Sequence, residues 1–182
     1  MKEREILDVI ASRISVRKFK NTDIPSQDID EIIRVGLSAP SAGNRQPWRI
    51  IIVRKNKIKS DLADGAYGQK FIAKAPVILV ICAVPAESEE RYGERGKTLY
   101  VYQDTAALTE NILLASHCMG YGSVWIGAFD EATIKQILEI PNEIRPVALI
   151  PIGIPDYPDG KVPKKRPRKT ILDIIIREKF HS

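Results

Sequence analysis

The sequence predicts an α+β protein in which helices and strands are mixed along the chain. Its 182 residues suit one domain, and a domain of this size buries roughly 70% of the surface of its unfolded chain. Hydrophobic residues make up 44% and charged residues 28%, which excludes disorder, collagen and coiled coil as descriptions of the whole chain. Few βαβ units can be recognised, so an α+β sandwich is favoured over a doubly wound sheet.

The first part of the chain predicts two helices joined by an extended segment. Residues 2–12 have the apolar period of a helix, and residues 13–20 alternate in the manner of an extended chain. Pro25 and Ser26 are expected to begin the second helix, with Ser26 as its N-cap. Residues 38–48 contain two prolines, a glycine and an asparagine, so they are expected to form a loop.

The middle of the chain predicts two strands. Residues 49–54 are strand-like, and a short helix is expected over residues 57–63. Residues 77–84 are a continuous apolar run with many β-branched side chains, which indicates a strand buried on both faces. The polar, glycine-containing residues 86–97 are expected to form a loop.

The second half predicts the longest helix and two further strands. That helix is expected over residues 98–119, ended by Gly120 or Gly122. The remaining expected elements follow in chain order: a short strand over 123–129, a helix capped by Asp130 and running through Leu138, a strand over 147–153, and an amphipathic piece over 171–179.

Positive charge is concentrated near the C-terminus. The formal net charge is +5, and residues Lys161–Lys169 contain six cations and no acid, which leaves −1 for the rest of the chain. Nucleic-acid sites usually combine cations with aromatic side chains. This segment contains no aromatic residue, so no nucleic-acid partner is expected.

Cysteine content and hydropathy predict a soluble, cytoplasmic protein. Cys82 and Cys118 form no C-x-x-C pair, and both are expected to be buried, free thiols in a reducing compartment. No apolar run approaches the roughly 18 residues of a membrane span, and charged residues interrupt the first positions, where a leader would be apolar. We therefore expect no membrane partner.

Several classes of active site are excluded by the motifs that are missing. The two histidines, His117 and His181, have no partner at metal-ligand spacing, so no metal site is expected. No nucleophile-elbow serine accompanies them, which argues against a Ser-His-Asp hydrolase. No P-loop is present, and Gly120 and Gly122 do not extend to G-x-G-x-x-G because residue 125 is Trp.

Three separate clusters of cations and amides remain. In the motif R-x-S-x-R, Arg13, Ser15 and Arg17 point the same way if the chain is extended, and they suit a phosphate or a polar ring edge. The loop Pro40–Trp48 is either a structural corner or a wall for a flat polar ligand. The basic segment is a ligand-binding element, a solvated tail or a weak RNA-binding tail. The R-x-S-x-R motif taken alone is better explained as a solvated cationic face.

Taken in order, these motifs resemble the nitroreductase family of FMN flavoproteins. The resemblance rests on R-I-S-V-R-K-F, A-P-S-A-G-N-R-Q-P-W, A-P-V before a buried strand, G-Y-G-S-V-W-I-G-A-F and a late P-R-K. Each motif alone is weak, but the set covers nearly the whole chain. The resemblance implies a mixed, mostly antiparallel sheet flanked by helices. It also implies a homodimer with two FMN molecules at its interface, in which residues of about 155–182 form an arm exchanged with the partner, so that residues 1–182 are one flavin-binding domain.

The resemblance also implies the residues of the phosphate and ribityl site. Arg13 and Ser15 would hold the phosphate and the ribityl chain, with Ile14 between them. Arg166 and Arg168 of the arm would complete the phosphate site.

Around the flavin ring the resemblance implies a second set of residues. Arg17 would stabilise negative charge at the pyrimidine edge, and Gln69 would present an amide. Ile126, Gly127 and Ala128 would pass close to the flavin N5, with a backbone N–H as its partner. Gly127 stands where larger members often have an acid, so the tuning of N5 is expected to differ.

The other subunit would supply the loop over the ring. Its residues would be Pro40, Ser41, Ala42 and Asn44, and Ala42 stands where many members have a second serine. Residues 86–97 are expected to be the only candidate lid, because the chain lacks the helical excursion of larger members.

The implied activity is reduction of an organic acceptor, such as a nitroaromatic compound or a quinone, by NADH or NADPH in a ping-pong cycle. No catalytic side chain is expected, because the flavin carries the redox chemistry. Two alternatives stay open. One is a flavin reductase or a reductive dehalogenase on the same fold, and the other is a non-catalytic flavin-binding protein.

Overall fold

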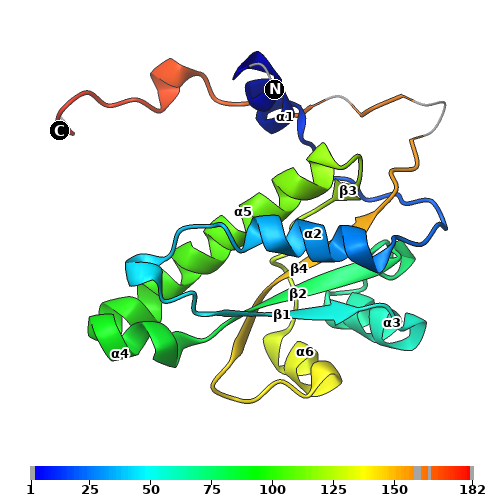
Figure 1. Ribbon diagram of the computed structural model, residues 1–182, viewed down its shortest axis with the longest axis horizontal. Coiled ribbons are helices and arrows are strands. Elements are labelled where there is room, and N and C mark those ends of the chain that lie inside the picture. The colour runs from blue at the N-terminus through cyan, green and yellow to red at the C-terminus, as the bar shows by residue number, and fades with distance from the viewer. Residues whose placement is uncertain (1–2, 158–160, 164, 181–182) are drawn as a thin grey trace.

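The computed structural model describes residues 3–157, 161–163 and 165–180, and it has a four-stranded sheet at its centre (Figure 1). The strands lie in the order β1-β2-β4-β3, and each neighbouring pair is antiparallel. Their bounds are Trp48–Val53 for β1, Val77–Ala83 for β2, Gly122–Ser123 for β3 and Arg145–Gly153 for β4. One isolated parallel pairing joins Ser15 to Ser123 of β3. Because this pairing is parallel and the others are antiparallel, the expected mixed, mostly antiparallel arrangement is confirmed.

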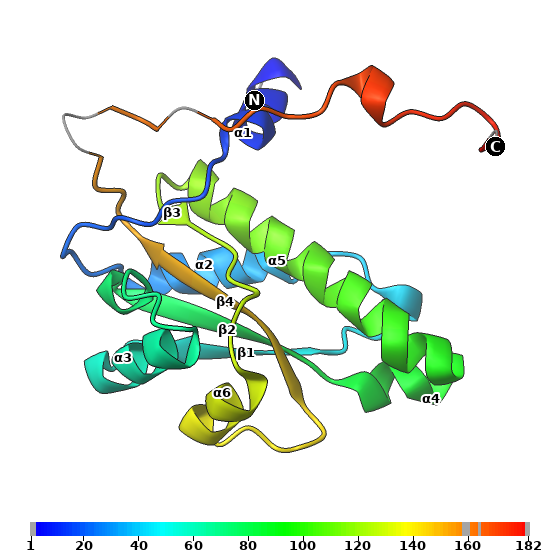
Figure 2. The ribbon, with the colours of Figure 1, turned by 180° about the vertical axis from the view of Figure 1, so that it is seen from behind.

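Helices cover both faces of this sheet (Figures 1 and 2). Their bounds are Glu3–Ser12 for α1, Ser26–Gly36 for α2, Asn56–Gly65 for α3, Pro85–Arg95 for α4, Val101–Cys118 for α5 and Glu131–Leu138 for α6. Short helical turns occur at Ala42–Asn44, Ile72–Lys74, Gly96–Tyr100 and Ile171–Asp173. The helices α2 and α5 pack on one face, and α3 and α6 pack on the other.

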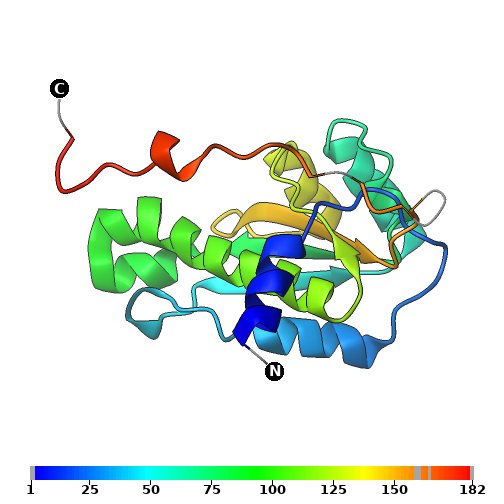
Figure 3. The ribbon, with the colours of Figure 1, turned by 90° about the horizontal axis from the view of Figure 1, so that it is seen from above.

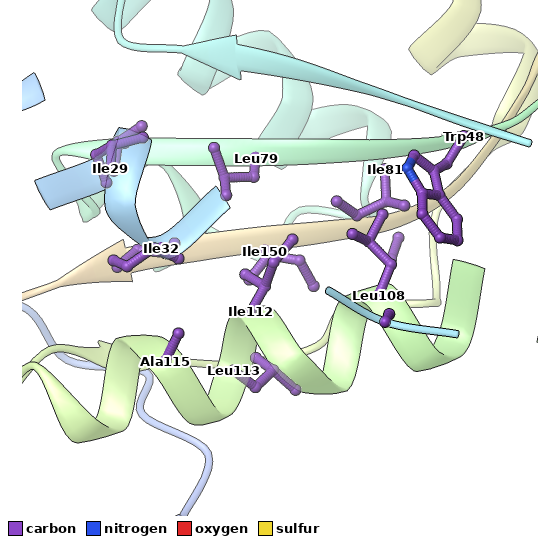
Figure 4. Packing of buried hydrophobic residues seen from close by; sticks show 14 of the residues in the cluster. Ile29, Ile32, Trp48, Leu79, Ile81, Leu108, Ile112, Leu113, Ala115 and Ile150 are labelled. Atoms are coloured by element: carbon purple, nitrogen blue, oxygen red, sulfur yellow. The ribbon is translucent and has the colours of Figure 1, made fainter. Parts of the chain in front are cut away.

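The central strand β2 divides the core in two. All seven of its residues are buried, because side chains alternate along a strand and both faces are covered. Leu79 and Ile81 join the cluster under α2 and α5, which Figure 4 shows with Ile112 of α5 against the sheet. Ile78 and Val80 join the cluster under α3 and α6. The prediction of a strand buried on both faces is therefore confirmed.

The prediction of a loop over residues 86–97 is wrong. These residues form most of α4, and they continue through the turn Gly96–Tyr100 into α5. Pro85 stands in the first turn, where a missing N–H costs nothing, and Gly93 interrupts the helix with a φ of +56°. The polar composition therefore belongs to a helix at the surface.

Three finer predictions also need correction. Ser26 is the first helical residue of α2 rather than its N-cap, and no side chain caps that end. Only Gly122–Ser123 of the predicted strand over 123–129 belongs to β3, with one isolated pairing of Ile126 with Leu149 farther on. Of residues 171–179 only Ile171–Asp173 form a helical turn.

The two ends of the chain lie on the same side of the molecule. Figure 2 shows the segment after β4 passing beside α1 and then extending away from the body, and Figure 3 shows the same extension from above. Every described residue from 161 onwards is exposed. The two cysteines also differ, because Cys82 is buried in β2 whereas Cys118 is exposed at the end of α5, which corrects the expectation that both are buried.

Candidate functional site

The R-x-S-x-R segment lies along the chain that follows α5. Ser15 pairs with Ser123, and the N–H of Val16 donates a hydrogen bond to the carbonyl oxygen of Ser123 at 3.0 Å. Val16 is buried, whereas Ser15 and Arg17 are exposed. A Cβ at Gly122 would lie 2.8 Å from the side chain of Val16, so only glycine allows this close approach. Ser15, Val16 and Arg17 therefore alternate as expected, but Arg13 and Arg17 line different cavities, so the three residues of the motif do not converge on one space within a single chain.

Arg13 borders a cavity of about 290 Å³ between the end of α1 and the end of α5. Ile14, His117 and Tyr157 also line this cavity. Arg13 is 3.8 Å from Glu110, its only ion-pair partner in the described part of the chain. Because the guanidinium is paired this loosely at the edge of a cavity, it can bind an anion there.

His117 lines this cavity, although no motif in the sequence singled it out. Its Nε2 lies 2.8 Å from Oγ of Ser12. Burial lowers the pKa of His117, and the nearby charges of Arg13 and Lys165 lower it further. The only sequence signal was a histidine in the last turn of the longest helix, and its partner Ser12 is remote in sequence.

The basic segment returns to the same place through Lys165. Its ammonium group donates a hydrogen bond to the carbonyl oxygen of Ala11 at the end of α1. Arg166 and Arg168 are exposed, and neither makes a hydrogen bond or ion pair with any residue that the structure describes. Within one chain, therefore, Lys165 approaches Arg13, and the two arginines remain in solvent.

Gln69 and the segment Ile126–Ala128 meet on the other side of Ser15. The amide nitrogen of Gln69 donates to the carbonyl oxygens of Ala66 at 2.9 Å and of Ala128 at 3.1 Å. Ile126 uses both its N–H and its carbonyl in hydrogen bonds to Leu149. No acceptor for the N–H of Gly127 or Ala128 is found among the described residues.

This segment leaves room for a flat ligand. Gly127 is exposed, and a Cβ there would meet only Trp125, at 3.9 Å. Arg17 lies nearby, with its guanidinium carbon 5.9 Å from the ring centre of Phe71. Arg17 borders a different cavity from that of Arg13, so the two arginines of the motif face different spaces.

The loop Pro40–Gln46 is held in a strained conformation. Gly43, Asn44 and Gln46 have φ values of +55°, +56° and +51°, a region that side chains other than glycine rarely adopt. Oγ of Ser41 accepts a hydrogen bond from the N–H of Gln46 at 3.0 Å, and Oδ1 of Asn44 accepts one from the side chain of Gln46 at 3.3 Å. The hydroxyl proton of Ser41 and the amide protons of Asn44 stay available to a ligand.

The helices α4 and α5 anchor this loop through hydrogen bonds and an ion pair. The N–H of Ala42 donates to Oδ1 of Asp104 at 3.0 Å, at the start of α5. Arg45 donates to the carbonyl oxygen of Glu87 at 2.9 Å and pairs with the carboxylate of Glu90, both on α4. The segment named as the only candidate lid is therefore a helix that contacts this loop through Arg45.

The loop and the Arg13 cavity lie at opposite ends of α5. Asp104 marks one end and His117 the other, and a rise of 1.5 Å per residue separates them by about 20 Å. One chain therefore does not bring Pro40, Ser41, Ala42 and Asn44 together with Arg13, Ile14 and Ser15. Within one chain a compact ligand at the Arg13 cavity therefore does not reach the loop.

The half-site of Arg13, Ser15, Gln69 and Gly127 offers the kinds of group that FMN would need, although Ser15 is not among the residues that line the cavity of Arg13. An exposed hydroxyl beside a weakly paired guanidinium suits a phosphate. Backbone N–H groups without an acceptor beside an open glycine suit a polar ring edge that comes close to the main chain. In contrast, no group of three or more His, Cys, Asp or Glu residues that could hold a metal occurs in the described ranges.

None of the helices in the part of the chain that the structure describes is both long and apolar enough to cross a membrane.

Comparison with known proteins supports the resemblance seen in the motifs. The sequence profile of the Nitroreductase family matches residues 10–69 and 62–154. The chain belongs to the nitroreductase family. A solved structure of a nitroreductase family protein from Clostridium novyi is 33% identical, with a TM-score of 0.77 over 86% of this chain and 88% of that one.

Two curated nitroreductase relatives carry names that refer to reduced nicotinamide nucleotides. A protein of Archaeoglobus fulgidus is 34% identical over 83% of this chain and 86% of its own length, and its provisional name is NADH dehydrogenase/NAD(P)H nitroreductase. A protein of Staphylococcus aureus named NADPH-dependent oxidoreductase is 25% identical over 97% of this chain and 74% of its own length.

Proposed function

We propose that this nitroreductase is an FMN-dependent oxidoreductase that takes hydride from NADH or NADPH and reduces a small organic acceptor in a ping-pong cycle. The observation that carries the proposal is the half-site in which the backbone N–H groups of Gly127 and Ala128 have no acceptor among the described residues and lie beside Gln69 and Arg17. Bound FMN would supply the redox chemistry.

The phosphate end of FMN is assigned to the cavity of Arg13. The guanidinium of Arg13 and the hydroxyl of Ser15 would donate to phosphate oxygens, and the main chain at Ile14 would line the ribityl chain. Lys165 lies close enough to add positive charge there, whereas His117, whose pKa is lowered, lines the same cavity as an uncharged ring. We assign Arg166 and Arg168 to a phosphate site on a partner subunit, because both are exposed on the extended arm.

The ring is assigned to the surface of residues 126–128. Because both backbone groups of Ile126 pair with Leu149, the N–H of Gly127 or Ala128 would be the donor to N5. Arg17 would hold positive charge near the pyrimidine edge, where it favours the anionic form of the reduced ring. Gln69 has its amide nitrogen committed to Ala66 and Ala128, so only its carbonyl oxygen remains to accept from the ring.

The complete site is assigned to a homodimer of this single-domain chain. The loop bearing Pro40, Ser41, Ala42 and Asn44 would come from the partner, because it lies about 20 Å along α5 from the Arg13 cavity of its own chain. The arm of residues 155–182 would wrap the partner. Its uncovered apolar side chains support this, since Leu172 and Phe180 are 88% and 87% exposed.

The choice of nucleotide and acceptor is tested together with the flavin. The purified protein is titrated with FMN, and bound flavin is followed by quenching of its fluorescence. The holoprotein is then mixed anaerobically with NADH or NADPH, and loss of the yellow absorbance is recorded. Recovery of colour on addition of a nitroaromatic compound, a quinone, free flavin or a halogenated aromatic compound identifies the acceptor class.

Each outcome distinguishes one hypothesis. Bleaching by either nucleotide, with recovery on a nitroaromatic compound or a quinone, is the expected result. Recovery only on free flavin or on the halogenated compound would favour the flavin reductase or the reductive dehalogenase. If the protein binds FMN and neither nucleotide bleaches it, the chain is a non-catalytic flavin-binding protein. If no FMN binds, the flavin assignment is wrong.

A further inference from the structure

A cavity of about 770 Å³ lies beside the proposed flavin site, on the far side of Arg17. Residues 17–23, which pass the end of β4 on their way to α2 (Figure 1), form one of its walls. The start of α3 and residues 73–76 form the other walls. Six cationic side chains line this cationic cavity: Arg17, Lys18, Lys20, Arg54, Lys59 and Lys74.

Positive charge in the cationic cavity is poorly compensated. Asp23 and Asp156 are its only carboxylates, and Asp23 is already paired with Arg54 at 2.8 Å. The body of the protein outside Lys161–Lys169 is nearly neutral, so six cations around one space are a local concentration rather than the general character of the surface. Such a concentration attracts anions.

Two cations at the back of the cationic cavity are buried or partly buried. Lys59 is only 5% exposed, and its ammonium group donates to the carbonyl oxygens of Ala75 at 2.7 Å and Pro76 at 3.5 Å. Both partners are uncharged, so its charge has no direct counter-ion. Burial lowers the pKa of Lys59, Arg54 lowers it further, and Asp23 opposes them.

Arg54 has a donor without a partner. Its Nη1 donates to Oδ1 of Asp23 at 2.8 Å and to the carbonyl oxygen of Ile24 at 2.9 Å, whereas its Nη2 is buried and unpartnered among the described residues. A buried donor of a charged group that lacks an acceptor is costly. An oxyanion in the cationic cavity would supply the missing acceptor for Arg54 and counter-charge for Lys59.

We propose that the cationic cavity is a second binding site, which holds the phosphate or pyrophosphate group of a small phosphorylated molecule. Its volume suits a ligand of nucleotide size. The guanidinium of Arg54 recognises phosphate oxygens with directed donors, and Lys20, Lys59 and Lys74 add point charges. This site is separate from the FMN phosphate site, because Arg13 and His117 line the other cavity.

Two sources offer this chemistry. One is a free phosphorylated metabolite. The other is the phosphate portion of NADH or NADPH. This source rests on the proposed function and on Arg17, which lines the cationic cavity and is also assigned to the flavin ring. Inorganic pyrophosphate is the probe that represents both.

The test is calorimetric titration of inorganic pyrophosphate into the full-length protein at low ionic strength, with FMN added in excess to occupy the flavin phosphate site. The variant Lys20→Ala/Lys74→Ala removes two exposed charges that line the cationic cavity, and Arg54→Gln removes the unpartnered donor. The matched control is Lys55→Ala/Lys57→Ala, which removes two neighbouring charges that do not line it. Circular dichroism verifies that each variant is folded.

We expect pyrophosphate to bind the wild type and the control equally, and the double variant and Arg54→Gln to bind it roughly tenfold more weakly. If the wild type does not bind pyrophosphate, or if the control loses as much affinity as the two cavity variants, the proposal is overturned. Loss of binding once FMN is added would also overturn it, because the probe would then occupy the flavin site. A protein that binds pyrophosphate but no FMN would refute the proposed function and leave this site intact.

Competition distinguishes the two sources. If pyrophosphate raises the KM for NADPH in the wild type but not in Lys20→Ala/Lys74→Ala, the nucleotide itself occupies the cationic cavity. If pyrophosphate binds without any effect on the KM for NADH or NADPH, the natural ligand is a separate phosphorylated molecule. Both results support an anion site, and they assign different occupants to it.

Discussion

Oδ1 of Asp104 accepts a hydrogen bond from the N–H of Ala42 at 3.0 Å, and Oδ2 of the same carboxylate is buried without a partner in the described chain. The first atom fixes the loop that carries Ser41 and Asn44. The second makes the charged form unfavourable, so burial raises the pKa of Asp104, while the hydrogen bond from Ala42 partly opposes this. The free energy that Asp104 contributes to folding therefore depends on pH.

Replacing Asp104 by Asn should remove this pH dependence. The unfolded pKa of an aspartate is about 3.9. An aspartate whose folded pKa lies above this value contributes most to the free energy of unfolding at low pH, and that contribution is lost as pH rises through the folded pKa. Asp104→Asn keeps an oxygen that can accept from Ala42. Relative to this variant, the free energy of unfolding of the wild type should be higher at pH 4.5 than at pH 7.5.

The measurement is urea unfolding of both proteins at the two pH values and at one protein concentration, because association would shift the midpoint. A difference that stays constant or grows with pH would show that the Asp104 carboxylate is not destabilised by burial.

Gly122 and Gly127 should respond differently to replacement by alanine. Gly122→Ala places a Cβ 2.8 Å from Val16, whereas Gly127→Ala places one 3.9 Å from Trp125. We expect Gly122→Ala to lower the free energy of unfolding by about 1–3 kcal/mol and to weaken FMN binding, because Val16 lies between Ser15 and Arg17. Gly127→Ala should fold as the wild type does. Equal stability of the two variants in urea would contradict the packing of Gly122 on Val16.

Sequence patterns predicted the parts of this fold that depend on local chemistry. The apolar run of β2 and the cap by Asp130, whose side chain accepts from Thr133 at 2.7 Å, lie where the sequence placed them. The helix α4 was missed because its residues are polar. Its contacts, such as those of Arg45 with Glu87 and Glu90, join segments remote in sequence.

In the candidate site, too, local sequence patterns predict only what depends on neighbouring residues. The alternation of Ser15, Val16 and Arg17 follows from an extended backbone. The roles of Asp104 and His117 do not follow from any local pattern, because each depends on a contact with a distant residue, Ala42 and Ser12 respectively. The separation of the two half-sites became visible only when α5 placed them at its opposite ends.

Arg13 should matter for FMN affinity more than an ordinary surface arginine does. Arg13→Gln removes the guanidinium at the edge of the cavity between α1 and α5, and loss of a charged hydrogen bond to phosphate should weaken FMN binding about tenfold or more. Arg34→Gln is the control, because Arg34 is exposed on α2 and pairs with Glu31. Quenching of FMN fluorescence measures the affinity of both variants for FMN. Unchanged affinity in Arg13→Gln would remove Arg13 from the phosphate site.

The two thiols should differ sharply in reactivity. Burial raises the pKa of Cys82 to about 11, so at pH 8 only about one molecule in a thousand carries the reactive thiolate, and the side chain is also inaccessible within β2. We expect Cys118→Ser to react with Ellman's reagent only after unfolding, while Cys82→Ser reacts through the exposed Cys118 in the native state. Rapid reaction of native Cys118→Ser would show that β2 opens or that the pKa of Cys82 is not raised.

The exposed apolar side chains of the arm should hold the proposed dimer together. Leu172 and Ile175 are 88% and 49% exposed in the single chain, and burial of such side chains against a partner contributes about 1.5–3 kcal/mol each. Leu172→Glu/Ile175→Glu should therefore shift the protein from dimer to monomer in light scattering after gel filtration, and FMN binding should weaken because the loop around Ser41 would no longer reach a second chain. Ile52→Glu is the control, since Ile52 is 45% exposed but lies on the outer strand β1. If the arm variant remains a dimer with full FMN affinity, the arm does not form the interface.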